Sequence, residues 1–157
     1  MHIIIMRHGE AETAQYEDSS RELTRFGLEQ AKAAGQWLLD RCEPSGIEMS
    51  LVSPFIRARQ TLEAVGEKIT VHSQTVSNDI TPDGNIWLTH DYIDYLLEEN
   101  RVKHSLLIVS HMPFVSYFLD EITGQQHSLF FDTSSIVMVD YQPTTHSGTV
   151  LDIYHPS

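Results

Sequence analysis

The stretch SLLIVSHMP, residues 105–113, sets the fold class of this chain. Its aliphatic centre has the length and composition of a buried strand, and Pro113 stands where a first helical residue needs no amide proton. The N-terminal stretch HIIIM, residues 2–6, is a second apolar run of the same kind. Strands that are apolar on both faces are typical of parallel sheets covered by helices on both sides.

The other segments alternate between strand and helix patterns. In chain order we predict a loop over 11–23, a helix from the N-cap Thr24 to Cys42, a strand over 49–53, a helix from Pro54 to Lys68, an extended segment over 69–76, a loop over 77–84, a helix through Glu99 with Asp83 as a candidate cap, a helix from Pro113 to Thr123, and strands over 135–141 and 149–154 that can pair as a hairpin. This alternation predicts an α/β sandwich with a mostly parallel central sheet, in a single domain over residues 1–157.

The balance of charge restricts the ligands of this chain. Ten Lys and Arg residues stand against 22 Asp and Glu residues, so the net charge is −12. A nucleic-acid-binding protein normally shows the opposite balance, and a field of this sign repels phosphate groups. We therefore expect no nucleic-acid partner, and any phosphate site must gather the few cations locally. The position of each arginine is informative for that reason.

The compartment can be argued from cysteine usage and hydropathy. The single cysteine, Cys42, cannot form an internal disulfide, which fits a reducing compartment. No apolar run approaches the roughly 20 residues of a membrane-spanning helix. The apolar N-terminal run is too short for a signal peptide and lacks a basic start. We expect a cytoplasmic protein with no membrane partner.

Reactive side chains follow three of the predicted strands. RHG at residues 7–9 follows the first strand, Arg57 lies shortly after the second, and His111 follows the strand over 105–110. The carboxyl ends of parallel strands meet at one edge of a sheet, where α/β folds bind their ligands. Neither histidine has His, Cys or carboxylate neighbours at the short spacing of a metal motif. The set therefore predicts an anion site built from imidazole and guanidinium groups, with no metal.

These motifs resemble the histidine phosphatase superfamily, whose defining motif is matched by RHG at residues 7–9. The fuller pattern is similar to the bacterial protein phosphohistidine phosphatases of that superfamily, from residue 1 to about residue 136. The matching residues are Met6-Arg7-His8-Gly9, Asp18-Ser19 with Arg21, Leu23-Thr24, Val52-Ser53-Pro54-Phe55 with Arg57-Ala58 and Gln60-Thr61-Leu62-Glu63, Thr81-Pro82, Ser110-His111 with Pro113, and Thr133-Ser134. The resemblance implies a three-layer, phosphoglycerate mutase-like sandwich.

The resemblance also implies a role for the main site residues. His8 attacks phosphorus and becomes phosphohistidine, while Arg7, Arg57 and His111 complete the catalytic set and hold the phosphoryl oxygens, with no cofactor. The residue types suit this chemistry. Neutral imidazole is a competent nucleophile, and adjacent cations should lower its pKa from about 6.5. Arginine donates a planar pair of hydrogen bonds to phosphate and keeps its charge.

Three further residues are candidates for substrate binding. Gly9 permits a tight turn and close approach of a ligand after the nucleophile. Arg21, in the loop before the first helix, can add a cation, and Asp18 lies three residues before it. Polar loop residues are usually only solvated, so this alternative stays open for Asp18 and Arg21.

The leaving group is the least determined feature of the reaction. Mutase-like members of the superfamily supply a glutamate as general acid from a stretch that corresponds roughly to residues 80–84 here. This chain has only Asp79 and Asp83 near that position, and Asp18 is a third candidate acid. A leaving group that needs little protonation, such as the nitrogen of phosphohistidine, fits a site without that glutamate. The chain also lacks room for cap insertions, which predicts a shallow, open site.

Three functional hypotheses follow. The first is a monomeric phosphatase that dephosphorylates a phosphohistidine-containing signalling protein, such as a histidine phosphotransfer domain, and releases phosphate. The second is a small-molecule phosphomonoesterase or mutase of the same superfamily. The third is a catalytically idle module that binds phosphate or phosphoproteins, which the presence of both histidines and both main arginines disfavours.

Overall fold

The computed structural model describes residues 1–13 and 16–156, in which six strands form one sheet. The strands are β1 (His2–Arg7), β2 (Met49–Val52), β3 (Gln74–Val76), β4 (Ser105–Ser110), β5 (Ile136–Gln142) and β6 (Ser147–Tyr154). Their order in the sheet is β3-β2-β4-β1-β5-β6. The first four in this order run parallel, and β5 and β6 add an antiparallel hairpin at one edge. The predicted mostly parallel sheet and C-terminal hairpin are confirmed.

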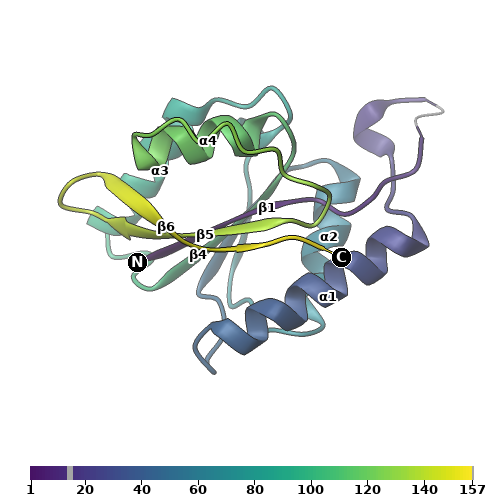
Figure 1. The fold of residues 1–157 in the computed structure, drawn as a ribbon, viewed down its shortest axis with the longest axis horizontal. Coiled ribbons are helices and arrows are strands. Elements are labelled where there is room, and N and C mark those ends of the chain that lie inside the picture. Colours follow the sequence, from purple (N-terminus) through teal and green to yellow (C-terminus); the bar gives the residue numbers. More distant parts are fainter. Residues whose placement is uncertain (14–15, 157) are drawn as a thin grey trace.

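Helices cover both faces of the sheet, which makes a three-layer sandwich. They are α1 (Arg25–Arg41), α2 (Ile56–Gly66), α3 (Ile86–Glu98) and α4 (Phe114–Thr123), with the short 3-10 helices η1 (Asp18–Ser20) and η2 (Asn78–Ile80) in loops. Figure 1 shows α1 and α2 on one side of the sheet and α3 and α4 on the other. Ile3 and Ile5 of β1 pack toward α3 and α4, whereas Ile4 and Met6 pack toward α1 and α2. In the described residues, no helix has the length and hydropathy to cross a bilayer.

Local capping decides where the helices start, and three starts differ from the prediction. α4 begins at Phe114, and Pro113 is its cap residue rather than its first helical residue. Thr24 caps α1 as expected. α2 begins two residues after Pro54, because Phe55 remains in an extended conformation. α3 is capped by Asn85 and not by Asp83, since the Asn85 side-chain oxygen accepts two helix amides at 3.0 and 3.1 Å. These shifts leave the order of the elements unchanged.

Strand register brings three chain segments to the same edge of the sheet. In the parallel pairs, Arg7 of β1 lies opposite Ser110 of β4, and Val52 of β2 lies opposite Val109 of β4. The first residue after β1, His8, donates its amide to the Ser110 carbonyl at 3.0 Å. The residues that follow β1, β2 and β4 therefore emerge side by side at the carboxyl edge.

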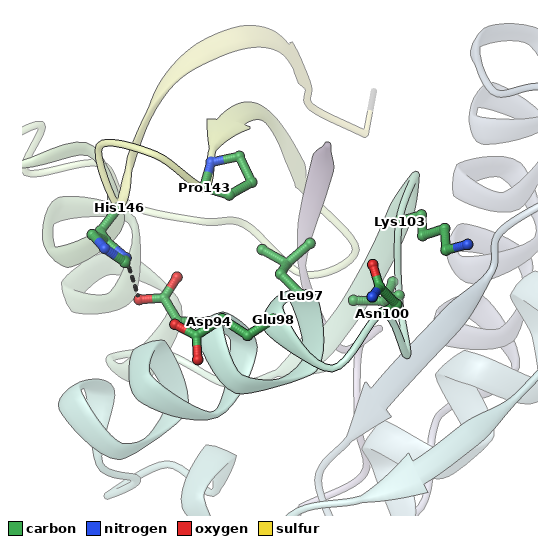
Figure 2. Close-up of a pocket in the computed structure, with 8 residues that line it drawn as sticks. Asp94, Leu97, Glu98, Asn100, Lys103, Pro143 and His146 are labelled. Atoms are coloured by element: carbon green, nitrogen blue, oxygen red, sulfur yellow. Dashed lines mark hydrogen bonds and ion pairs between the residues drawn. The ribbon is translucent and has the colours of Figure 1, made fainter.

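The opposite edge of the sheet carries a cavity of about 280 Å³. The cavity lies between the C-terminal part of α3, the segment before β4 and the turn between β5 and β6 (Figure 2). Asp94 of α3 and His146 of that turn face each other there, with His146 Nδ1 3.0 Å from Asp94 Oδ2. None of the predicted site residues lines this cavity, so it is separate from the site described next.

Candidate active site

The imidazole of His8 is held in one tautomer by its neighbours. His8 follows β1 directly and is only 5% exposed. Its Nδ1 lies 2.7 Å from the carbonyl oxygen of Gly9, which can only accept, so Nδ1 carries the proton. The Nε of Arg57, which can only donate, lies 3.2 Å from His8 Nε2. Nε2 therefore keeps a free electron pair, which is what a nucleophile needs.

Arg57 connects the nucleophile to the loop between β1 and α1. Arg57 lies in the first turn of α2 and is 4% exposed. Its Nη1 donates to the Asp18 carbonyl at 2.7 Å, and its Nη2 pairs with Asp18 Oδ2 at 3.1 Å. The other carboxylate oxygen of Asp18 pairs with Arg21 Nη1 at 3.1 Å. The structure thus links Asp18 and Arg21 to the site through Arg57.

Arg7 is fixed by the segment that leads into β5. Its Nη1 donates to the Phe131 carbonyl at 2.8 Å, and its guanidinium carbon lies 5.7 Å from the centre of the exposed Phe130 ring. Burial lowers the pKa of Arg7, with the Asp132 carboxylate opposing this shift. Among the described residues, nothing hydrogen-bonds the buried Nε of Arg7. That N–H is therefore available to a ligand.

His111 stands beside His8 after β4. The two ring centres are 5.0 Å apart, with an interplanar angle of 60°. His111 is 1% exposed, and its Nε2 lies 2.7 Å from the hydroxyl oxygen of Ser53. The ring of Phe55 packs against the imidazole with centres 4.9 Å apart. The structure thus brings Arg7, His8, Arg57 and His111 together, as predicted from their positions after the strands.

Several buried polar atoms in the described segments next to His8 lack a hydrogen-bond partner. In the part of the chain that the structure describes, four buried side-chain atoms lack a hydrogen-bond partner, namely Arg7 Nε, His111 Nδ1, Ser134 Oγ and Ser135 Oγ. Ser134 belongs to this region, since its amide donates to the Arg7 and His8 carbonyls at 3.1 and 3.0 Å. An unpaired buried polar group costs about 1–3 kcal/mol. Phosphoryl oxygens only accept hydrogen bonds, so they can pair with those of the four groups that carry a proton.

Both imidazoles are uncharged at neutral pH. Burial, together with the positive charges of Arg57 and Arg7, lowers the pKa of His8 from 6.5 to about 3, although the Gly9 carbonyl opposes the shift. Burial, the His8 ring and Arg57 lower the pKa of His111 to about 2. The lowered pKa of His8 is predicted from the adjacent cations, but burial is the larger cause. A neutral, desolvated imidazole is ready to attack phosphorus.

Three of the reactive side chains are buried. His8, Arg57 and His111 are each at most 5% exposed. Two segments bond to the arginines of the site, since the Asp18 carbonyl accepts from Arg57 and the Phe131 carbonyl accepts from Arg7.

Gly9 shapes the turn after the nucleophile. Its amide donates to Thr61 Oγ1 at 3.0 Å, and this hydroxyl donates to the Arg57 carbonyl at 2.7 Å. A Cβ on Gly9 would come within 2.6 Å of the Gly27 carbonyl oxygen, so packing requires glycine here. The Gly9 amide is occupied by Thr61 in this structure. Thr61 was not among the predicted site residues, although it stands one helical turn after Arg57, a spacing that is visible in the sequence.

In the described structure, the candidate general acids form no bond to the imidazoles of the site. Within residues 1–13 and 16–156, no hydrogen bond or ion pair joins a carboxylate to His8 or His111. Asp18 bonds to Arg57 and Arg21, and Asp79 and Asp83 are exposed. Those same residues contain no group of three or more His, Cys, Asp or Glu placed to hold a metal ion.

Comparison with known proteins identifies relatives over most of the chain. A family model described as histidine phosphatase superfamily (branch 1) matches residues 3–78. Phosphohistidine phosphatase SixA of Escherichia coli (strain K12) is 37% identical over 140 residues, which cover 88% of this chain and 84% of that protein. A phosphohistidine phosphatase SixA homolog of Haemophilus influenzae (strain ATCC 51907 / DSM 11121 / KW20 / Rd) is 37% identical over 147 residues, which cover 88% of this chain and 87% of that protein.

A solved structure agrees with these relatives. The structure of the protein histidine phosphatase SixA complexed with tungstate matches this one with a TM-score of 0.91 and 35% identity, over 99% of this chain and 97% of that chain. The range matched by the family model contains Arg7, His8 and Arg57, and the similarity to SixA extends far beyond it. Identity at this level over nearly nine-tenths of the sequence shows that the chain belongs to the histidine phosphatase superfamily.

Proposed function

We propose that this protein is a protein phosphohistidine phosphatase that works through a covalent phosphohistidine on His8. The observation that carries the proposal is the position of His8 Nε2, the unprotonated ring nitrogen, which accepts from Arg57 Nε at 3.2 Å, while Arg7 Nε and His111 Nδ1 are buried without a partner in the described residues. Two relatives that share 37% of their residues with this chain are named for the same activity.

The geometry supports a two-step transfer. In the first step His8 Nε2 attacks phosphorus, the new N–P bond forms, the bond to the leaving nitrogen breaks, and that nitrogen takes up a proton from water. Arg7, Arg57 and His111 offer N–H donors to the phosphoryl oxygens and so stabilise their negative charge. In the second step water attacks phosphorus, the N–P bond to His8 breaks, Nε2 regains its electron pair, and inorganic phosphate leaves as the water gives up a proton to solvent.

The surroundings of the imidazoles favour a nitrogen leaving group. An alkoxide needs a proton as it departs, and a positioned acid typically contributes about 10²–10⁴-fold. The carboxylate that approaches the site, that of Asp18, pairs with Arg21 and Arg57 rather than with an imidazole. The imidazole of phosphohistidine is easier to expel than an alkoxide, so the reaction depends less on such an acid.

The identity of the partner is a finer part of the same proposal. We infer a histidine phosphotransfer domain of a cytoplasmic signalling protein as the substrate, because such a domain carries phosphohistidine, the group named in the activity of the two relatives. The enzyme would act on it as a monomer and as one domain over residues 1–157. Light scattering of the purified protein measures the oligomeric state, and cell fractionation measures the location.

One comparison of substrates tests the proposal. The values of kcat/KM are measured for a phosphohistidine-bearing phosphotransfer domain, for phosphoserine and for a sugar phosphate. We expect the phosphorylated domain to be hydrolysed at least a hundredfold faster than the two alkyl phosphates, on the scale of general-acid assistance, which is roughly 10²–10⁴-fold. Faster hydrolysis of an alkyl phosphate would instead support the small-molecule phosphomonoesterase.

A further inference from the structure

The hydroxyl of Ser53 makes two contacts that together determine its proton. Ser53 is the first residue after β2 and is fully buried. Its Oγ accepts the amide proton of Phe55 at 3.2 Å and lies 2.7 Å from Nε2 of His111. Within the described part of the chain, these are the hydrogen bonds that this hydroxyl makes.

Only one arrangement of protons satisfies these groups. The Phe55 amide can only donate, so it uses a lone pair of the Ser53 oxygen. If the hydroxyl donates to His111 Nε2, its own proton and the imidazole lone pair are both paired. If Nε2 instead carries a proton and donates to Ser53, the hydroxyl proton is buried without an acceptor, at a cost of about 1–3 kcal/mol. The first arrangement is therefore favoured.

The proton of His111 then lies on the other ring nitrogen. His111 is neutral, because burial lowers its pKa to about 2, so only one nitrogen is protonated. With Nε2 accepting from Ser53, this nitrogen is Nδ1, which is buried and has no partner within residues 1–13 and 16–156. An Nδ1–H group attracts phosphoryl oxygens, whereas an Nδ1 lone pair repels them.

We propose that Ser53 is a positioning residue that holds His111 in the Nδ1–H tautomer, so that this N–H donates to the phosphoryl group during transfer. The role in transfer rests on the proposed phosphatase function. The tautomer itself can be observed without any turnover. In this arrangement Ser53 does not touch the reacting atoms. It acts only through His111.

Long-range ¹H–¹⁵N NMR of the histidine rings tests the tautomer directly, since protonated and unprotonated ring nitrogens have different ¹⁵N shifts. We expect wild-type His111 to carry its proton on Nδ1, and Ser53→Ala to populate the Nε2–H tautomer. Ser77→Ala is the matched control. The Ser77 hydroxyl accepts the amide of Asp79 at 3.2 Å, the same local bond that Ser53 makes, but no imidazole contact is among its hydrogen bonds. This control should leave the His111 spectrum unchanged.

Kinetics test the consequence for transfer. We expect Ser53→Ala to lower kcat roughly tenfold to a hundredfold with a smaller change in KM, since the wrong tautomer of His111 removes a donor to the transition state. Ser53→Thr, which keeps the hydroxyl, should restore the rate. Ser53→Ala combined with His111→Ala should be no slower than His111→Ala alone, because Ser53 acts only through His111.

Different results would overturn different statements. A wild-type His111 with its proton on Nε2, or a tautomer that Ser53→Ala leaves unchanged, would refute the role of Ser53, whatever the substrate. So would additive kinetic losses in the double variant. Poor activity on phosphohistidine proteins, with the Nδ1–H tautomer intact and its ¹H resonance shifted by inorganic phosphate, would refute the proposed substrate and leave the role of Ser53 standing. If Ser53→Thr does not fold, the Ser53→Ala spectrum and the double variant still decide.

Discussion

The Nε of Arg57 lies 3.2 Å from Nε2 of His8, so the arginine donates to the lone pair that attacks phosphorus. This bond cannot persist once phosphorus is attached to Nε2, because the lone pair is then used. The Arg57 N–H then needs another acceptor, and a phosphoryl oxygen can provide it. Arg57 therefore orients the nucleophile before transfer and can bind the phosphoryl group afterwards.

The first prediction concerns the nucleophile. His8→Ala should abolish turnover, because no other described side chain offers a free imidazole lone pair beside Arg57. The fold should persist, since His8 lies in neither of the two apolar core clusters. Brief exposure of the wild-type protein to ³²P-labelled substrate, followed by quenching, should leave acid-labile, base-stable phosphate on His8. Appreciable turnover by the alanine variant would contradict the mechanism.

The second prediction concerns Arg7 and Arg57. Arg7→Ala and Arg57→Ala should each lower kcat by roughly a hundredfold to a thousandfold, the scale for losing one preorganised donor. Arg59→Ala is the matched control, because Arg59 lies on the same helix as Arg57 and is exposed. The control should retain nearly full activity. Equal losses in all three variants would mean that the overall positive charge of the protein, rather than the position of Arg7 and Arg57, supports the reaction.

The alternation of strands and helices, and the convergence of the site, could be predicted from the sequence for a physical reason. Apolar runs such as residues 2–6 have no polar face, so they belong in the middle layer of a sandwich. Parallel strands then share a carboxyl edge, which places His8 and His111 together without any knowledge of the strand order. The structure adds that β4 lies between β1 and β2, so His111 stands next to both partner segments.

Other features depend on contacts that no local pattern records. Asp18 reaches Arg57 across 39 residues of sequence, and its loop gives no sign of that pairing. Phe131 holds Arg7 through a backbone carbonyl, which every residue possesses. Asp83 and Asn85 are both good caps, and only the packed position of α3 decides in favour of Asn85. The pairing of Asp18 with Arg57, the role of Phe131 and the cap of α3 were missed or misassigned because tertiary packing selects among locally equivalent choices.

The third prediction concerns the dependence of stability on pH. The pKa of His8 is lowered to about 3 and that of His111 to about 2, whereas both should be near 6.5 in the unfolded chain. Between these values the unfolded state binds more protons, so the free energy of unfolding falls as the pH drops below 6.5. At pH 5 each histidine should cost about 2 kcal/mol relative to its contribution at pH 8.

Chemical denaturation at pH 8 and pH 5 measures this effect. The double variant with His8→Asn and His111→Asn should lose several kcal/mol less than the wild-type protein over this interval. His104→Asn, at an exposed histidine, is the control and should leave the wild-type slope in place. If the double variant kept the full wild-type slope, acid sensitivity would have to come from other groups.

The fourth prediction concerns divalent metals. Full activity should survive exhaustive treatment with a chelator, since the positive charge needed at the phosphoryl group is supplied by Arg7 and Arg57. A divalent cation next to His8 would be repelled by these arginines, whose charges already lower the pKa of the imidazole. Loss of activity on chelation, restored by one specific metal, would contradict this prediction.

The last prediction concerns proton supply to the leaving group. Asp18→Asn, Asp79→Asn and Asp83→Asn should each reduce turnover of phosphohistidine protein by less than about tenfold, below the usual range of general-acid assistance. Asp18→Asn should have the largest effect of the three, because its carboxylate also holds Arg57 at 3.1 Å. That loss should be shared by phosphohistidine and by an aryl phosphate such as p-nitrophenyl phosphate, since Arg57 serves both. An acid acts differently, because it matters most for the poorest leaving group. If one of these changes left phosphohistidine turnover intact but abolished a strong hydrolysis of alkyl phosphates, that aspartate would be the general acid and the protein a general phosphomonoesterase.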